Sequence, residues 1–349
     1  MFSLPSEVQL DVLKCLKFKQ LFSLKQTNFY FYNLIKKYEG ELARMEFCSL
    51  NLFRTKSQEM CPCVFINFEP VVSDFVLNDH LLEKWEKAIS KSIPLFLHAV
   101  NYDSVDDIED DIQDIAVHMT NTDYKKPRFI LELPNIPKTI NEMVIVRYWL
   151  KQLFQYAYFK FAEFDNIIFN PEMINLLFDN DKTILKQFYV HTILFIRDDV
   201  NGNIFEFALN HFTIYGYLDI HLSQDDIVEK YTDILFNIII NEGNKIPAVR
   251  FTSFELSRLY DLIIEYITTS KDFSKMVTDI FLAYVSVKNF KLPETAEYVR
   301  TCETSIFCFL TCKSTDYKIV NIYNPKIKFV LSNNETNHVS DVCIKRIEE

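Results

Sequence analysis

The first forty residues carry apolar side chains at a helical period and predict three short helices. Leu4-Pro5 followed by Glu7 is typical of a helix start, because proline suits the first helical position and an acid suits the first turn. Leu21 and Leu24 indicate a brief second helix, and Thr27-Asn28 can cap a third. Three helices in so short a segment cannot bury all of their apolar faces. Either the rest of the chain or a partner must therefore cover some of them.

After Met45 the chain alternates between strand-like and helical patterns. Strands rich in Phe, Tyr, Ile and Val are expected at 63–68, 95–100, 128–133, 159–169, 188–196, 213–222, 248–254, 277–287 and 306–311. Helices are expected at 78–90, 141–156, 171–178, 203–211, 224–241 and 257–270.

A strand followed by a helix, repeated about every 30 residues, predicts an α/β fold with a mainly parallel sheet. The equal steps favour a leucine-rich-repeat-like solenoid over a doubly wound sheet, although aromatic residues stand where the leucines of such repeats would be. The tail from 305 to 330 predicts two or three antiparallel strands with a turn at Asn324-Pro325. We expect three parts: a three-helix unit at residues 1–44, an α/β repeat domain at 45–304, and a C-terminal strand segment at 305–349 packed on that domain.

The scarcity of glycine excludes several classes of enzyme. The chain of 349 residues holds only four glycines, and no two of them lie close together. Phosphate-binding loops, dinucleotide-binding fingerprints and nucleophile elbows each need clustered glycines. P-loop NTPases, Rossmann dehydrogenases, protein kinases and ordinary α/β-hydrolases are therefore not expected.

The charge pattern predicts no nucleic-acid partner. The formal net charge is −11, and the densest basic pairs, Lys36-Lys37 and Lys125-Lys126, are short. Between Asp103 and Asp114 the chain holds seven acids, which could bind calcium or steer a basic partner. A solvated acidic segment is the preferred interpretation, because neither a turn glycine nor a terminal glutamate supports an EF-hand.

The chain shows no secretory signal and no apolar run long enough for a transmembrane helix, so we expect it in the cytosol or nucleus. The eight cysteines are expected to be reduced thiols buried as small hydrophobic groups. Neither the cysteines nor the seven scattered histidines show the spacing of a metal site, and no cofactor is expected. An unrecognised enzyme with a Cys–His pair assembled in space remains an alternative.

The N-terminal pattern resembles an F-box. The resemblance rests on the run from Leu4 to Leu16, then Leu21, Leu24, Phe31 and Leu34-Ile35. The segments 25–31 and 37–44 resemble, more specifically, the expanded F-box families of nematodes, particularly plant-parasitic ones. Gln20 and Thr27-Asn28 differ from the usual F-box pattern.

The resemblance implies a non-catalytic substrate receptor of a Skp–cullin–RING ubiquitin ligase. Residues 4–35 would dock on a Skp-type adaptor, and through it on a cullin, while the α/β domain would hold an unknown protein target. The residues implied in adaptor binding are Leu4, Pro5, Val8, Val12, Leu13, Leu16, Phe18, Leu21, Leu24 and Leu34. The differences at Gln20 and Thr27-Asn28 motivate a second hypothesis, an interaction scaffold that directs no degradation.

Overall fold

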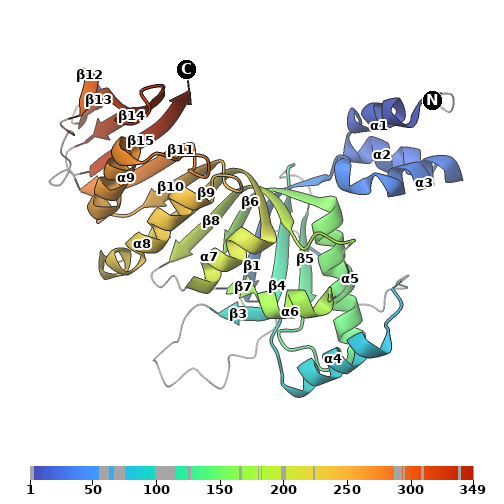
Figure 1. Ribbon diagram of the computed structural model, residues 1–349. Helices are drawn as coiled ribbons and strands as arrows, with labels where there is room; N and C mark the ends of the chain where they lie inside the picture. The colour runs from blue at the N-terminus through green and yellow to red at the C-terminus, as the bar shows by residue number, and fades with distance from the viewer. Residues whose placement is uncertain are drawn as a thin grey trace.

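Three short helices at one end of the molecule precede a large curved sheet (Figure 1). The computed structural model describes residues 4–54, 63–66, 75–98, 115–123, 127–164, 167–179, 181, 183–197, 202–222, 225–286, 293, 295–307, 310–336 and 339–348. The N-terminal helices are α1 (Ser6–Lys14), α2 (Phe18–Lys25) and α3 (Phe29–Lys37), followed by the short 3-10 helix η1 (Glu39–Glu41). The three predicted helices are confirmed, and α3 ends at Lys37.

The remaining strands and helices are β1 (Met45–Arg54), β2 (Cys63–Ile66), α4 (Asp79–Ser90), β3 (Phe96–His98), β4 (Ile115–Asn121), β5 (Arg128–Leu133), α5 (Ile140–Tyr156), β6 (Ala157–Phe164), β7 (Ile167–Phe169), α6 (Pro171–Leu177), β8 (Phe188–Arg197), α7 (Gly202–His211), β9 (Phe212–Leu222), α8 (Asp225–Asn241), β10 (Ala248–Thr252), α9 (Ser257–Thr269), β11 (Asp279–Ser286), β12 (Ala296–Phe307), β13 (Leu310–Val320), β14 (Ile327–Glu335) and β15 (Val339–Glu348). The six predicted helices of this region are confirmed within one residue at each end.

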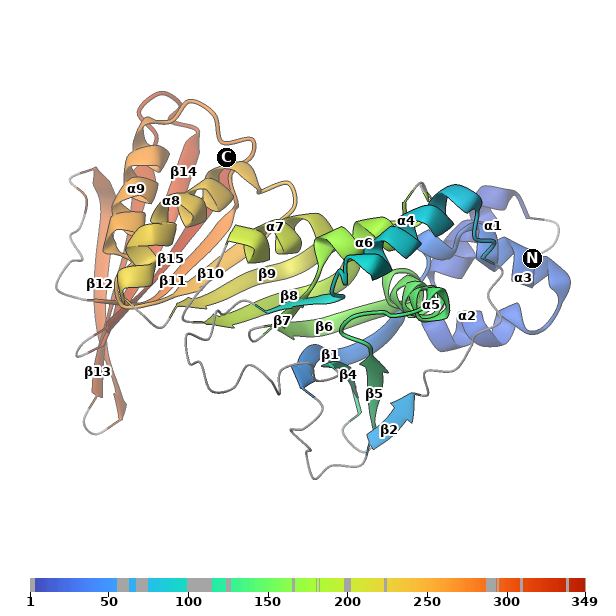
Figure 2. The ribbon, with the colours of Figure 1, turned by 90° about the horizontal axis from the view of Figure 1, so that it is seen from below.

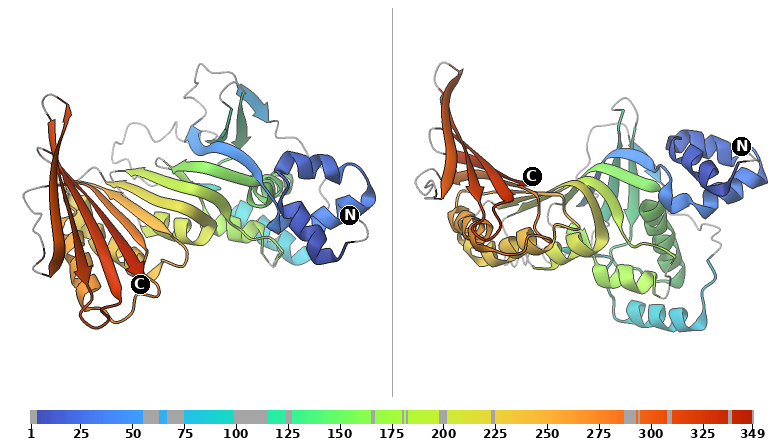
Figure 3. Two further views of the ribbon diagram at one scale, coloured as in Figure 1. Left: turned by 90° about the horizontal axis from the view of Figure 1, so that it is seen from above. Right: turned by 45° about the horizontal axis from the view of Figure 1, so that its top comes forward.

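One large sheet contains most of the described strands, in the order β12-β13-β14-β15-β11-β10-β9-β8-β6-β1-β4-β5-β2. Its centre is a parallel row in which β1, β6, β8, β9, β10 and β11 are neighbours in chain order. Strand crossovers have a fixed hand, so a row in chain order places the connecting helices on one face. Figures 2 and 3 show this arrangement, with the helices on one face and the strands open on the other.

The sheet is mixed, which corrects the prediction of a mainly parallel one. Antiparallel strands extend both ends of the parallel row: β4 pairs with β1, and β15 pairs with β11. The predicted strand at 159–169 is two strands, because β7 leaves the large sheet and pairs with β3. The strands β1 and β4 had not been predicted. The reversal of strand order that marks a doubly wound sheet is absent from the parallel row described here.

The C-terminal strands begin earlier and are more numerous than predicted. Four antiparallel strands run from Ala296 to Glu348 and join the same sheet. Phe307 pairs with Leu310, so a hairpin turn falls inside the strand predicted at 306–311. The amide of Asn321 donates to three carbonyls at the end of α9, and this buried side chain fixes the turn that contains the predicted Asn324-Pro325.

Aromatic side chains fill the space between the helices and the sheet. Phe188 lies at the centre, with ring centroids 4.8 Å from Phe154, 5.3 Å from Phe169 and 5.2 Å from Phe212. All four side chains are buried. Aromatic pairs at such distances add to the free energy of burial.

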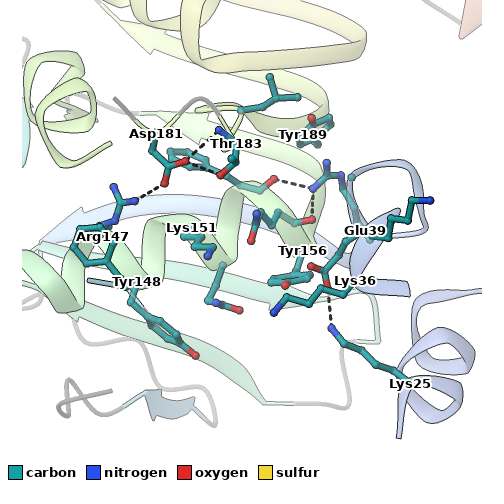
Figure 4. A pocket seen from close by; sticks show the side chains of 18 of the residues that line it. Lys25, Lys36, Glu39, Arg147, Tyr148, Lys151, Tyr156, Asp181, Thr183 and Tyr189 are labelled. Carbon is teal, nitrogen blue, oxygen red and sulfur yellow. Dashed lines mark hydrogen bonds and ion pairs between the residues drawn. The ribbon is translucent and has the colours of Figure 1, made fainter. Parts of the chain in front are cut away.

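Arg44 joins the N-terminal helices to the sheet domain. Its guanidinium donates hydrogen bonds to the carbonyls of Phe154 and Gln155, at the C-terminal end of α5, and lies 3.4 Å from the ring centroid of Tyr189. A cation is favoured there, because the last carbonyls of a helix carry partial negative charge. Burial lowers the pKa of Arg44. Nearby, Glu39 lies beside Tyr156 of α5, and this carboxylate together with burial raises the pKa of the phenol (Figure 4).

Replacing Arg44 should loosen this junction. We expect Arg44→Met to lower the free energy of unfolding by about 1–3 kcal/mol, because the carbonyls of Phe154 and Gln155 lose a charged donor. The measurement is urea unfolding, together with limited proteolysis between Leu42 and Met45, which should be faster in the variant. Arg258→Met is the control, because Arg258 forms only an exposed ion pair. Equal effects of the two substitutions would contradict the assigned role.

Gly243 follows α8 at a point of close backbone approach. A Cβ atom added there would lie 2.3 Å from the carbonyl oxygen of Met276, whereas a Cβ at Gly40 would meet no atom within 4 Å. We expect Gly243→Ala to destabilise the protein by about 1–3 kcal/mol, because backbone cannot move aside as a side chain can. Gly40→Ala should change the melting temperature little. Equal melting temperatures for the two variants would show that the backbone adapts.

Candidate adaptor-docking helices and the helix-free face of the sheet

The first helix presents an apolar stripe to solvent. Leu4 is 38% exposed, and Val8 and Val12 are each 40% exposed. Val8 and Val12 are four residues apart and so lie on one side of α1, and Leu4 stands just before the helix begins. Leu13, on another side of α1, is fully buried. Two exposed apolar side chains along a nine-residue helix, with a third just before its start, are a candidate contact surface.

The ten residues implied in adaptor binding fall into three groups. Leu4, Pro5, Val8 and Val12 are exposed, and Leu16, Phe18, Leu24 and Leu34 are half-buried. Leu13 and Leu21 lie instead in a small core with Ile35 and Leu42. In this conformation the side chains of Leu13 and Leu21 hold the helices together and do not reach a partner. Direct contact is left to the exposed and half-buried groups.

Two polar side chains fix the start of α1. Gln9 is buried, and its amide donates to the carbonyl of Leu4 at 2.7 Å. Tyr30 of α3 donates its hydroxyl hydrogen to the Oε1 of Gln9 at 2.6 Å. The Leu4-Pro5 segment is thereby tied to α3, which holds the apolar stripe in place. The sequence pattern did not reveal this contact, because Gln9 occupies a position that a helical period assigns to a polar surface residue.

The positions that differ from the usual F-box pattern have local structural roles. The Oε1 of Gln20 accepts a hydrogen bond from the backbone of Lys17 at 2.9 Å and so closes the start of α2. Asn28 caps α3 by accepting from the backbone of Phe31 at 3.0 Å, as predicted. Thr27 donates to the carbonyl of Leu24. These residues thus support the three helices that the F-box pattern requires.

The face of the sheet that the described helices leave open carries a strip of aromatic side chains. Phe161 of β6 is 51% exposed and Tyr215 of β9 is 54% exposed. Tyr158 lies 5.9 Å from Tyr215 between ring centroids. Exposed aromatic residues at this density are typical of contact surfaces for proteins. The sequence alone could not separate these residues from the buried aromatics on the same strands.

A charged group lies beside this strip. Asp219 of β9 is within 3.2 Å of the Nε2 of His221 and 3.7 Å of Arg250 on β10. Burial raises the pKa of the Asp219 carboxyl, against the opposing effect of His221 and Arg250. The guanidinium of Arg250 also lies over the rings of Tyr217 and Phe281, at 5.6 Å from each centroid. The open face therefore combines aromatic and charged groups in adjacent positions.

The cysteine and histidine residues on and near the open face give little support to the enzyme hypothesis. Cys343 of β15 and His221 line one hollow of about 530 Å³ on the open face. Burial raises the pKa of the Cys343 thiol, whereas a nucleophilic cysteine has a lowered pKa. His211 is buried against the carbonyl of Lys186, and burial lowers its pKa, as expected of a histidine satisfied within the core.

The cysteines differ from the prediction. Six are described, and none of these six is buried: Cys15 and Cys302 are exposed, and the others are half-buried. The described parts of the chain bring no three His, Cys, Asp or Glu residues together as metal ligands. Within these parts no helix is both long and apolar enough to cross a membrane. The acidic segment from Asp103 to Asp114 and the pair Lys125-Lys126 lie outside the described residues.

Comparison with known families matches two parts of the chain. An F-box domain matches residues 1–40, which contain α1, α2 and α3. A family described as a domain of unknown function (DUF8381) matches residues 66–223, from the end of β2 to the end of β9. No curated protein and no solved structure matches the chain. F-box domains bind Skp-type adaptors and thereby the cullin, and F-box proteins are generally non-catalytic. These findings support an F-box protein with N-terminal F-box helices followed by a large mixed α/β sheet domain.

Proposed function

We propose that this protein is a substrate receptor of a Skp–cullin–RING ubiquitin ligase. The observation that carries the proposal is the exposed stripe of Leu4, Val8 and Val12 within the F-box match. An apolar row on the outer helix of an F-box gives a Skp-type adaptor a surface to cover. In Figure 1 these helices lie apart from the layers of the sheet domain, so an adaptor bound there leaves the sheet accessible.

The adaptor contact uses the exposed residues first. Leu4, Pro5, Val8 and Val12 would meet the adaptor directly, and the half-buried Leu16, Phe18, Leu24 and Leu34 would contribute their exposed edges. Leu13 and Leu21 would act through the small core that orients these helices. The Gln9–Tyr30 hydrogen bond keeps the stripe in register for binding.

The target would bind the helix-free face of the sheet. The strip formed by Tyr158, Phe161 and Tyr215 supplies large apolar contacts, and Arg250 with Asp219 supplies charged ones. Such a receptor needs no catalytic residue of its own. It brings a lysine of the target near the ubiquitin-carrying enzyme and raises the effective concentration of the two.

We propose further that the chain is related to the nematode F-box families and that residues 45–304 have leucine-rich-repeat-like character. We also propose that the protein acts in the cytosol or nucleus. The one-sided placement of the helices supports the repeat character, because strand–helix solenoids stack their units in chain order.

Substitutions on the stripe test adaptor binding. We expect Val8→Glu with Val12→Glu to abolish the complex with a co-expressed Skp-type adaptor, because two carboxylates would be desolvated in an apolar contact. Both side chains are exposed, so the variant should fold. The measurement is size-exclusion chromatography of the co-expressed pair. Val299→Glu with Ile322→Glu, also exposed and far along the chain, is the matched control. A stable complex with the stripe variant would overturn the proposal.

Substitutions on the open face test target binding separately. We expect Phe161→Ala with Tyr215→Ala to keep the adaptor and to lose the proteins that accumulate on the wild-type chain when the proteasome is inhibited, because the aromatic anchors are gone. Phe254→Ala with Tyr323→Ala removes equally exposed aromatics elsewhere and is the control. Quantitative mass spectrometry of the purified complexes measures the difference. Proteins that bind but do not respond to proteasome inhibition would favour the scaffold hypothesis.

A further inference from the structure

A large cleft lies between the N-terminal helices and α5. Its volume is about 830 Å³, at the upper end of the range for ligand-binding pockets. Residues from α2, α3 and η1 line one side, and residues from α5 and the segment before β8 line the other (Figure 4). The cleft therefore lies where the F-box and the sheet domain meet.

The cleft is basic in a protein that is acidic overall. Among the described residues that line it, six cationic side chains outnumber the two carboxylates Glu39 and Asp181, in a chain of net charge −11: Lys25, Lys36, Lys37, Arg44, Arg147 and Lys151. They come from separate segments of the sequence and are brought together only by the fold. Such a local reversal of sign attracts anions into the cleft.

Three of the six cations bond to carboxylates or carbonyls of the chain itself. Lys25 pairs with Glu39 at 2.8 Å, and Arg147 pairs with Asp181 at 2.5 Å. The guanidinium of Arg44 faces the end of α5, as described above. Both arginine forks are thus committed to groups of the chain itself.

The other three cations are not held by any described carboxylate, although the ammonium groups of Lys36 and Lys37 lie 5.8 Å and 4.8 Å from the ring centroids of Tyr32 and Tyr38. Lys36, Lys37 and Lys151 form no ion pair with any carboxylate in the described part of the chain. Lys36 and Lys37 lie in the last turn of α3, where they also favour the helix dipole. The interaction with the helix dipole does not require a cation on the facing helix, but Lys151 of α5 provides one. Figure 4 shows Lys36 extending from the α3 side towards α5.

We propose that this cleft binds an acidic peptide segment, with side-chain carboxylates seated between Lys36 and Lys37 of α3 and Lys151 of α5. Lysines act as single point charges, which attract carboxylates without the fixed two-bond geometry of an arginine fork. The side-chain amides of Gln152 and Gln155 line the same cleft and offer donors and acceptors to peptide backbone. The proposal does not depend on adaptor docking or on the open face of the sheet.

The test is a titration of the full-length chain with a fluorescent peptide of about eight glutamates, followed by anisotropy. At about 0.15 M salt the Debye length is about 8 Å, so the charges of the cleft outweigh the distant acids. We expect binding that weakens as salt is raised. The triple variant Lys36→Ala, Lys37→Ala and Lys151→Ala should bind about tenfold more weakly, because it loses three cation–carboxylate contacts.

Control variants distinguish binding at this cleft from nonspecific electrostatic attraction of the peptide to the protein surface. Lys271→Ala, Lys275→Ala and Lys326→Ala remove the same charge from exposed positions near the other end of the molecule and should leave the affinity unchanged. Equal loss in the two triple variants, or equal binding of a glutamine peptide, would overturn the proposal. Binding of a phosphoserine peptide without binding of the glutamate peptide would also overturn it, in favour of a phosphate site. Adaptor binding, measured separately, should be unchanged in the cleft variant.

Discussion

The fold depends on burying one face of a parallel row of strands under helices that all lie on the same side. Because each crossover returns the chain to the strand next in order, the helices cannot cover the second face. Phe188 and the rings around it fill the covered side, and their contact distances show a densely packed layer. The open side must then be compatible with water while remaining rich in aromatics such as Tyr215. A surface of this kind, supported by a packed layer behind it, suits recognition of another protein.

Much of the fold follows from local pattern, and the failures have physical causes. Helix starts can be recognised from capping residues such as Asn170-Pro171, so the six helices after Met45 were predicted closely. The hairpin between Phe307 and Leu310 was missed because the apolar run from 306 to 311 contains no glycine, asparagine or proline to mark a turn. Pairing between β1 and β4 joins residues far apart in the sequence, and no local pattern reports it. The mixed character of the sheet could not be predicted for the same reason.

The candidate sites divide in the same way. Leu4, Val8 and Val12 could be found from their helical spacing, but spacing could not tell their exposed side from the side that carries Leu13. The basic cleft could not be predicted from the sequence, because Lys36 and Lys151 are more than one hundred residues apart. Each of them alone is an ordinary helix-surface lysine. Charge that is dispersed in sequence and concentrated in space needs a fold to be recognised.

The number of strands in the parallel row also sets the distance between the F-box helices and the far end of the sheet. Arg44 anchors the F-box at α5 and β8, and each further strand of the row lies about 4.8 Å beyond the last. Inserting or deleting one strand–helix unit between β8 and β11 would change the distance from the anchor to the far strands by that increment, with the anchor itself untouched. The number of units therefore acts as a ruler. An architecture of this kind can change the separation of its two ends in steps of about one strand spacing.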